Sequence, residues 1–146
     1  MNGPLIPKKR PSDVEKHRLT EPVLNKRAQQ CVAEGTELFN RGKFWDAHEA
    51  WEEAWRGCEE ESRIFFQGII QVAAGYHLLF ERPRPAGAQR NFQKALEKLE
   101  LFPGEFLGFN VAEIKSAVKE AIRRLGEGGS SPAGIPMPFI GRRKAQ

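Results

Sequence analysis

The sequence predicts an all-α fold, an antiparallel bundle of about five helices with disordered N- and C-terminal arms. In five segments the apolar residues recur three and four positions apart, which is the pattern of helices with one buried face. Proline and glycine clusters separate these segments, and no segment shows the apolar–polar alternation of a half-buried strand. We expect one domain, with a flexible arm at 1–21, the helical domain at 22–126 and a flexible tail at 127–146.

Residues at their ends help to place the helices. Pro22 suits a first helical turn, Gly42 follows the end of the first helix, and Asn110 with Glu113 forms a capping-box pattern. The third segment is apolar nearly all round, as expected of a central buried helix. The expected helices are 22–40, 44–56, 62–80, 86–102 and 110–125.

The net charge of +4 at neutral pH arises from the two ends of the chain. Residues 1–22 carry five Lys or Arg against three Asp or Glu, residues 126–146 carry three against one, and residues 23–125 carry 15 of each. A balanced core lacks the clustered basic face of a nucleic-acid groove, so nucleic acid is not an expected partner. We expect the arms to add little stability, with Phe139 and Ile140 as candidates for docking on the core or on a partner.

Localisation in the cytoplasm is expected from three absences in the sequence. No apolar run approaches the length of a bilayer span, and the basic residues near the N-terminus are not followed by the apolar stretch of a secretory signal. Cys31 and Cys58 are 27 positions apart and lack metal-ligand spacing. Two cysteines do not make a disulfide framework, so reduced thiols in a reducing compartment are expected. We therefore expect no membrane partner, whereas a homo-oligomer stays open.

The residues with candidate chemistry lie on the second and third helices. At about 100° per residue His48 falls on the core face of its helix, and Glu52 lies one turn later. Gln67 and Gln71 repeat this spacing and need partners, because an unpaired buried amide costs about 1–3 kcal/mol. Antiparallel packing would set Glu52 against Gln67 and His48 against Gln71, whereas His77 is expected on another face of the third helix.

Three interpretations of this group stay open. The residues could form a structural polar network, or a pocket for a small ligand in which His48 and Glu52 are the catalytic pair. The same two side chains could hold a divalent metal, although a catalytic metal site needs at least a third ligand. The sequence therefore does not decide whether the protein is an enzyme or has a cofactor. The pocket candidates are Glu49, Trp51, Trp55, Gln67, Gln71 and His77.

The segment from Ala28 to Glu61 resembles one tetratricopeptide hairpin. Its small and aromatic residues match the spacing of that repeat, but nothing similar recurs 34 residues later, so an array is not supported. The resemblance implies a helical protein-interaction module as a further alternative. The matching positions are Gly35, Gly42, Phe44, Ala47, Trp51 and Ala54.

A larger part of the chain, roughly residues 33–125, resembles a small prokaryotic helical family, the domain of unknown function family 309. Three blocks carry the resemblance: residues 39–56, residues 66–77, and Gly87-Ala88 with the following 95–99. The resemblance implies a helical fold without an established activity, and some members are labelled predicted metal-dependent hydrolases. The polar positions of the family correspond here to His48, Glu49, Glu52, Gln67, Gln71 and His77.

Overall fold

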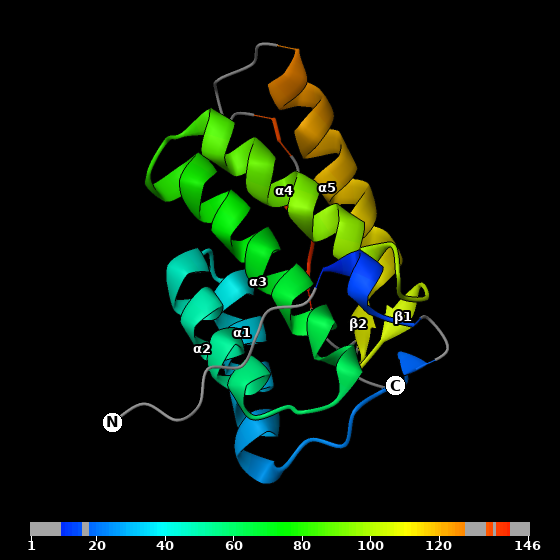
Figure 1. The fold of residues 1–146 in the computed structure, drawn as a ribbon. Helices are drawn as coiled ribbons and strands as arrows, with labels where there is room; N and C mark the ends of the chain where they lie inside the picture. Colours follow the sequence, from blue (N-terminus) through cyan, green and yellow to red (C-terminus); the bar gives the residue numbers. More distant parts are fainter. Residues whose placement is uncertain (1–9, 16–17, 128–133, 136, 141–146) are drawn as a thin grey trace, which may run out of the picture.

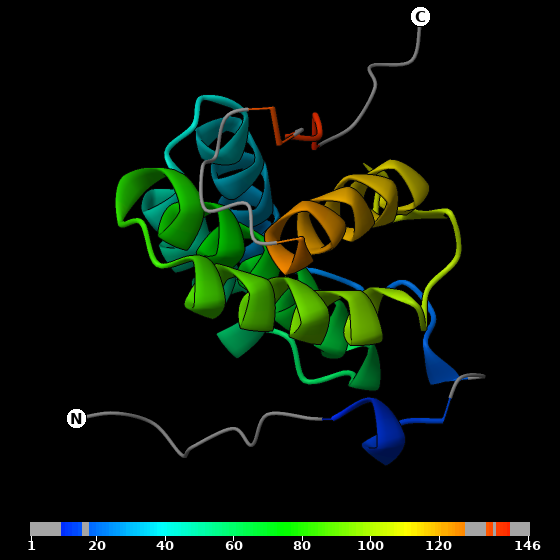
Figure 2. The ribbon, with the colours of Figure 1, turned by 90° about the horizontal axis from the view of Figure 1, so that it is seen from above.

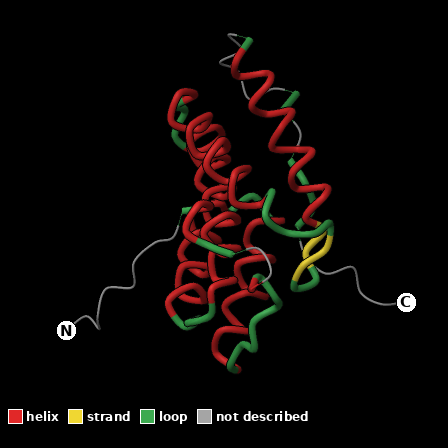
Figure 3. Tube along the Cα trace, turned by 45° about the vertical axis from the view of Figure 1, so that its right-hand side comes forward, coloured by secondary structure: helices red, strands yellow, loops and turns green. Residues whose placement is uncertain are grey.

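The protein is an all-α bundle, as the sequence predicts (Figure 1). The computed structural model describes residues 10–15, 18–127, 134–135 and 137–140. Within these described residues, five α-helices follow one another with short connections, and two short strands pair beside them (Figure 3). The helices are α1 (Lys26–Asn40), α2 (Phe44–Arg56), α3 (Ile64–Tyr76), α4 (Pro85–Leu99) and α5 (Val111–Gly126).

Short helical turns adjoin several of the α-helices. The 3-10 turns η1 (Pro11–Asp13) and η3 (Glu61–Arg63) precede α1 and α3, and a π-helical turn, η4 (His77–Glu81), extends α3. The first helix begins four residues later than predicted, because the Asn25 side chain caps it by accepting a hydrogen bond from the Ala28 backbone N–H at 2.7 Å. No described helix combines the length and the apolarity that crossing a bilayer requires.

The central element of the bundle is α3, which packs against both α2 and α4. Two of its glycines let α4 approach closely. A Cβ atom on Gly68 would lie 3.1 Å from Leu99, and one on Gly75 would lie 2.5 Å from the ring of Phe92. The nearly all-round apolarity of this segment therefore matches its position between two helices.

Helices α1 and α2 form an antiparallel hairpin around a buried tryptophan. Gly42 makes the turn with a φ of 81°, a conformation that favours glycine. The Trp51 ring is fully buried and packs directly against Gly35. A Cβ atom at position 35 would lie 2.5 Å from this ring, so a larger residue would not fit without a shift. The Trp51 Nε1 donates a hydrogen bond to the Val32 carbonyl at 3.2 Å, so the hairpin is fixed by both packing and a polar contact.

A two-stranded hairpin between α4 and α5 is a difference from the prediction, which contained no strand. β1 (Glu105–Phe106) pairs antiparallel with β2 (Phe109–Asn110) around a two-residue turn. Both turn residues, Leu107 and Gly108, have positive φ angles, which is the requirement of a type I′ hairpin turn. Leucine seldom adopts this conformation, so the turn gave no recognisable signal in the sequence.

The described parts of both arms contact the core. Leu19 is buried, and the Glu21 carboxylate accepts a hydrogen bond from the backbone N–H of Leu107 at 2.7 Å. Ile135 and Ile140 are also buried, whereas Phe139 is 61% exposed. The proposed docking of the tail is therefore seen for Ile140, and the basic clusters at 8–9 and 142–144 lie outside the described residues.

Candidate functional site

The predicted polar residues lie along the line where α2 packs against α3, which we call the α2–α3 seam. On α2, His48 Nε2 lies 3.7 Å from a carboxylate oxygen of Glu52. The other oxygen of Glu52 accepts a hydrogen bond from Arg56 at 2.9 Å. The side chains of His48 and Glu52 are 16% and 24% exposed, so both lie at the rim of the bundle. The helical spacing therefore produces the His48–Glu52 pair that the sequence predicts.

Trp45 connects the two helices of the seam. Its ring stacks on the imidazole of His48, with ring centroids 4.6 Å apart and an interplanar angle of 9°. The imidazole of His77 contacts the same indole, with ring centroids 5.0 Å apart. Because Trp45 is 46% exposed, it presents an aromatic surface to solvent between two histidines from different helices.

His77 has a carboxylate partner that sequence reasoning did not identify. Its Nδ1 lies 2.8 Å from Glu81 Oε1, a shorter contact than the one between His48 and Glu52. Through Trp45, whose ring stacks on His48, His77 is connected to the pair on α2. The π-helical turn η4 carries both His77 and Glu81, and such turns are frequent at functional sites.

The two glutamines of α3 have partners on different neighbouring helices. Gln67, which is 5% exposed, accepts a hydrogen bond from Trp55 Nε1 at 3.1 Å. Gln71 accepts one from Nζ of Lys98 on α4 at 2.7 Å, and Lys98 is itself buried. Lys98 was not among the predicted site residues, since the sequence alone does not show that α4 turns this position toward α3.

Both glutamines line a small cavity of about 40 Å³ between α2 and α3. It has room for a few water molecules at most, and ligand pockets are usually several hundred Å³ in volume. A ligand too large for this cavity would therefore have to bind on the outer surface of the α2–α3 seam, beside Trp45. The lining residues are Glu52, Trp55, Gln67, Ile70 and Gln71.

Two of the predicted pocket residues face α1 and not the seam. Trp51 packs in the α1–α2 hairpin, as described above, and Glu49 lies in a shallow groove between α1 and α2. Their side chains are separated from the seam because they lie on other faces of α2. The group that the structure brings together is His48, Glu52, Trp55, Gln67, Gln71 and His77, with Trp45, Glu81 and Lys98 added.

The candidate metal ligands give an incomplete donor set. His48 and Glu52 supply two donors on one helix turn, and no group of three or more His, Cys, Asp or Glu residues that could hold a metal occurs among the described residues.

The cysteines are not activated nucleophiles either. Burial raises the pKa of the Cys31 and Cys58 thiols, which disfavours the reactive thiolate.

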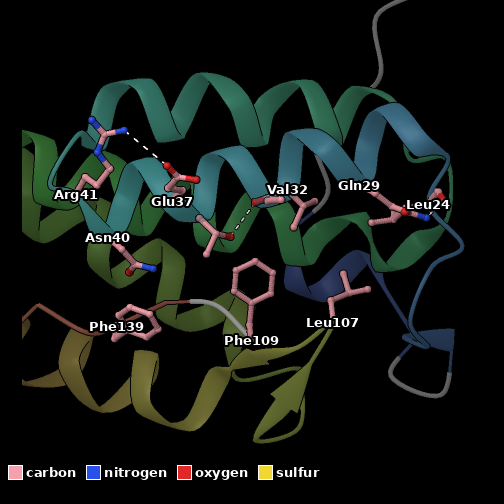
Figure 4. A pocket seen from close by; sticks show the side chains of 11 residues that line it. Leu24, Gln29, Val32, Glu37, Asn40, Arg41, Leu107, Phe109 and Phe139 are labelled. Atoms are coloured by element: carbon pink, nitrogen blue, oxygen red, sulfur yellow. Dashed lines mark hydrogen bonds and ion pairs between the residues drawn. The ribbon is translucent and has the colours of Figure 1, made fainter. Parts of the chain in front are cut away.

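A much larger cavity, of about 710 Å³, lies along the outer side of α1 and was not predicted from the sequence (Figure 4). We call it the α1 groove. Its walls are α1, the β1–β2 hairpin and the C-terminal segment around Phe139. Its lining combines six apolar residues with five polar or charged ones. The lining residues are Leu24, Gln29, Val32, Ala33, Thr36, Glu37, Asn40, Arg41, Leu107, Phe109 and Phe139.

The C-terminal segment is held at one end of the α1 groove by its backbone. The Asn40 side chain accepts a hydrogen bond from the Ile140 N–H at 2.9 Å, and its amide group donates one to the Ile140 carbonyl. A single side chain thus binds both backbone groups of one residue, as a neighbouring strand would. Ile140 is fully buried at this place.

Comparison with known proteins supports the predicted family resemblance. The chain is 29% identical over 97 residues to an uncharacterized protein of Aquifex aeolicus (strain VF5), and the aligned region covers 66% of this chain. The match spans 29% of the length of that relative. The model of the domain of unknown function DUF309 matches residues 32–91. The predicted resemblance to this family is therefore confirmed, and the DUF309 match extends from the middle of α1 to the middle of α4.

Proposed function

We propose that this protein is a helical interaction module that binds extended peptide segments in the α1 groove. One observation carries the proposal: Asn40, a lining residue of the groove, binds a segment of its own chain through two hydrogen bonds to the Ile140 backbone. Contacts to backbone atoms accept many sequences, while apolar side chains beside them supply selectivity. This function agrees with the tetratricopeptide-like spacing of the α1–α2 hairpin.

The size and the lining of the α1 groove support the same function. Its volume of about 710 Å³ lies in the range of ligand sites in proteins. Val32 and Phe109 are buried side chains that line it, and Phe139 adds an exposed aromatic ring at the occupied end. A peptide that carries large apolar residues could bury them here, and each would contribute about 1.5–3 kcal/mol.

The test is the binding of a labelled peptide of residues 134–146 to the full chain, measured by fluorescence anisotropy. The recipient carries Phe139→Asp and Ile140→Asp, so that its own segment no longer competes. We expect saturable binding, and Asn40→Ala should weaken it about tenfold, because two hydrogen bonds are lost at about 0.5–1.5 kcal/mol each. Gln30→Arg, an exposed position of α1 that does not line the groove, is the matched control. Absence of binding at millimolar peptide would refute this function.

The α2–α3 seam favours a second candidate function, the binding of a small aromatic ligand with proton transfer by His77. The observation behind it is that Glu81 lies within hydrogen-bonding distance of His77 Nδ1, which would orient the ring and direct Nε2 as the base. Trp45 would supply a surface for the ligand ring. The donor set described above does not suit a resident metal, so this candidate function uses only side chains of the chain.

The activated ester p-nitrophenyl acetate is a suitable probe of this second function. We expect Trp45→Ala to raise KM and His77→Ala to lower kcat, since the two residues would bind the ring and accept the proton, respectively. Glu81→Gln should lower kcat in the same direction, whereas His17→Ala, at the remaining histidine of the sequence, is the control. A rate equal to that of free imidazole, unchanged by His77→Ala, would exclude proton transfer at this place.

A further inference from the structure

The chain contains two segments with the same order of residue types. Residues 4–9 read Pro-Leu-Ile-Pro-Lys-Lys, and residues 138–143 read Pro-Phe-Ile-Gly-Arg-Arg. Each has a proline, a large apolar residue and an isoleucine, then a proline or glycine, and then two basic residues. In the second segment, Phe139 lines the α1 groove, and Asn40 at the same end binds the backbone of Ile140. The first segment therefore has the same order of proline, large apolar residue and isoleucine as the part of the second segment that meets the groove.

We propose that the open part of the α1 groove binds residues 4–9 of a second copy of this chain, so that two copies exchange their N-terminal segments. The inference rests on the proposed peptide-binding function and names its partner. Leu5 and Ile6 would pack against Val32, Phe109 and the exposed ring of Phe139.

The length and the charge of the segment fit the α1 groove. The groove follows α1, whose 15 residues extend about 22 Å at 1.5 Å per residue. Six residues of extended chain span about 20 Å. At the rim, the carboxylate of Glu37 is 73% exposed and lies 3.8 Å from the Arg41 guanidinium, so Lys8 or Lys9 would share this carboxylate with Arg41.

The position of Arg10 indicates that the bound segment of residues 4–9 comes from a second copy and not from the same chain. Arg10 is held at η1 by Asp13, whose carboxylate accepts a hydrogen bond from the Arg10 N–H at 3.0 Å. Figure 2 shows η1 on one side of α3 and α4 and residues 137–140 on the opposite side. Arg10, the first described residue, thus lies on the side away from the groove of its own chain. Two copies related by a two-fold axis could fill both grooves reciprocally.

The test is the association of the full chain, measured by sedimentation between 10 and 500 µM. We expect a dimer, and Leu5→Asp with Ile6→Asp should weaken it at least 30-fold. Ala33→Arg, an exposed position inside the groove, should do the same, whereas Gln30→Arg on the same helix should leave the dimer unchanged. Circular dichroism of each variant establishes that the helices are retained.

Mixing the two disrupted variants gives the sharper result. The Ala33→Arg copy keeps its segment and the Leu5→Asp/Ile6→Asp copy keeps its groove, so together they should form a heterodimer that neither forms alone. A monomer at 500 µM, or a dimer insensitive to Leu5 and Ile6, would overturn the proposal. The full chain could be a monomer while its Leu5→Asp/Ile6→Asp variant binds a peptide of residues 1–10. This result would overturn the proposal that the segment comes from a second copy. If only the peptide of residues 134–146 binds, the interaction function stands and this inference fails.

Discussion

Replacing Gly75 by alanine tests how closely α3 and α4 pack. The added Cβ atom would lie 2.5 and 2.6 Å from two ring carbons of Phe92. This ring is fully buried and also meets Tyr76 edge-on, with ring centroids 4.9 Å apart, so it cannot rotate away freely. The contacts are about 1 Å shorter than favourable carbon–carbon separations, and relief requires a shift of the helices.

Two opposing effects determine how much Gly75→Ala changes the free energy of unfolding. Overpacking of a core costs about 1–3 kcal/mol, and the higher helix propensity of alanine returns about 1 kcal/mol. Because the contacts are so short, we take the upper part of the first range and expect Gly75→Ala to lower the free energy of unfolding by about 1–2 kcal/mol. A loss of this size lowers the Tm by roughly 2–8 °C for a chain of this length.

The assay is urea unfolding followed by circular dichroism, with Gly57→Ala as the matched control. Gly57 has a φ of −86°, and a Cβ atom there would meet its nearest neighbours at 3.7 Å. This control should stabilise the protein by about 0.4–1 kcal/mol, because it restricts only the unfolded chain. Equal stability of the two variants would show that Phe92 or α4 yields without cost, and would refute the argument from close packing.

Three further predictions concern the buried Trp55, the partly exposed carboxylate of Glu120 and the tail. Trp55→Ala should cost about 3–5 kcal/mol in urea unfolding, because the ring is 7% exposed and its hydrogen bond to α3 is lost; a neutral result would show that the ring faces solvent. Hydrogen bonds from Arg123, and to a smaller extent from Arg124, lower the pKa of Glu120 to about 2. The contribution of this carboxylate to the free energy of unfolding is therefore complete above pH 4.5 and is lost as the pH falls toward 2. A carboxyl midpoint near pH 4.5 in an NMR titration would contradict this. Ile140→Asp should cost about 2 kcal/mol through lost burial, and an unchanged unfolding midpoint would mean that the docked tail does not stabilise the fold.

The order of the helices and the His48–Glu52 pair could be predicted because both depend on local spacing. Residues four apart on a helix are neighbours whatever the rest of the fold does, and the apolar stripe fixes which face is buried. The same rule could have found Glu81, which is four residues after His77. The Pro-rich segment after it suggested a break, and the prediction did not foresee that a π-helical turn would continue to Glu81.

The contacts between distant segments could not be predicted from one sequence. Lys98 reaches Gln71 only because the glycines of α3 bring α4 close, and Asn40 binds a residue 100 positions away. Neither pair has a periodicity that a sequence could show. The α1 groove depends on the second of these contacts and on the β1–β2 hairpin, so it became visible only in the structure.

The α2–α3 seam and the α1 groove should act independently. Trp45 contacts His77 of η4, whereas Ala33 lines the groove on α1, and the buried side chains of Phe39 and Trp51 lie in the hairpin between α1 and α2. These two rings stack on each other with centroids 5.8 Å apart, and a packed core of this kind moves little when an exposed residue changes. The effects of Trp45→Ala and Ala33→Arg on unfolding and on peptide binding should therefore add within about 0.5 kcal/mol in the double variant. A larger coupling energy would mean that a shift of α2 connects the two sites, and the peptide would then be expected to alter the environment of Trp45.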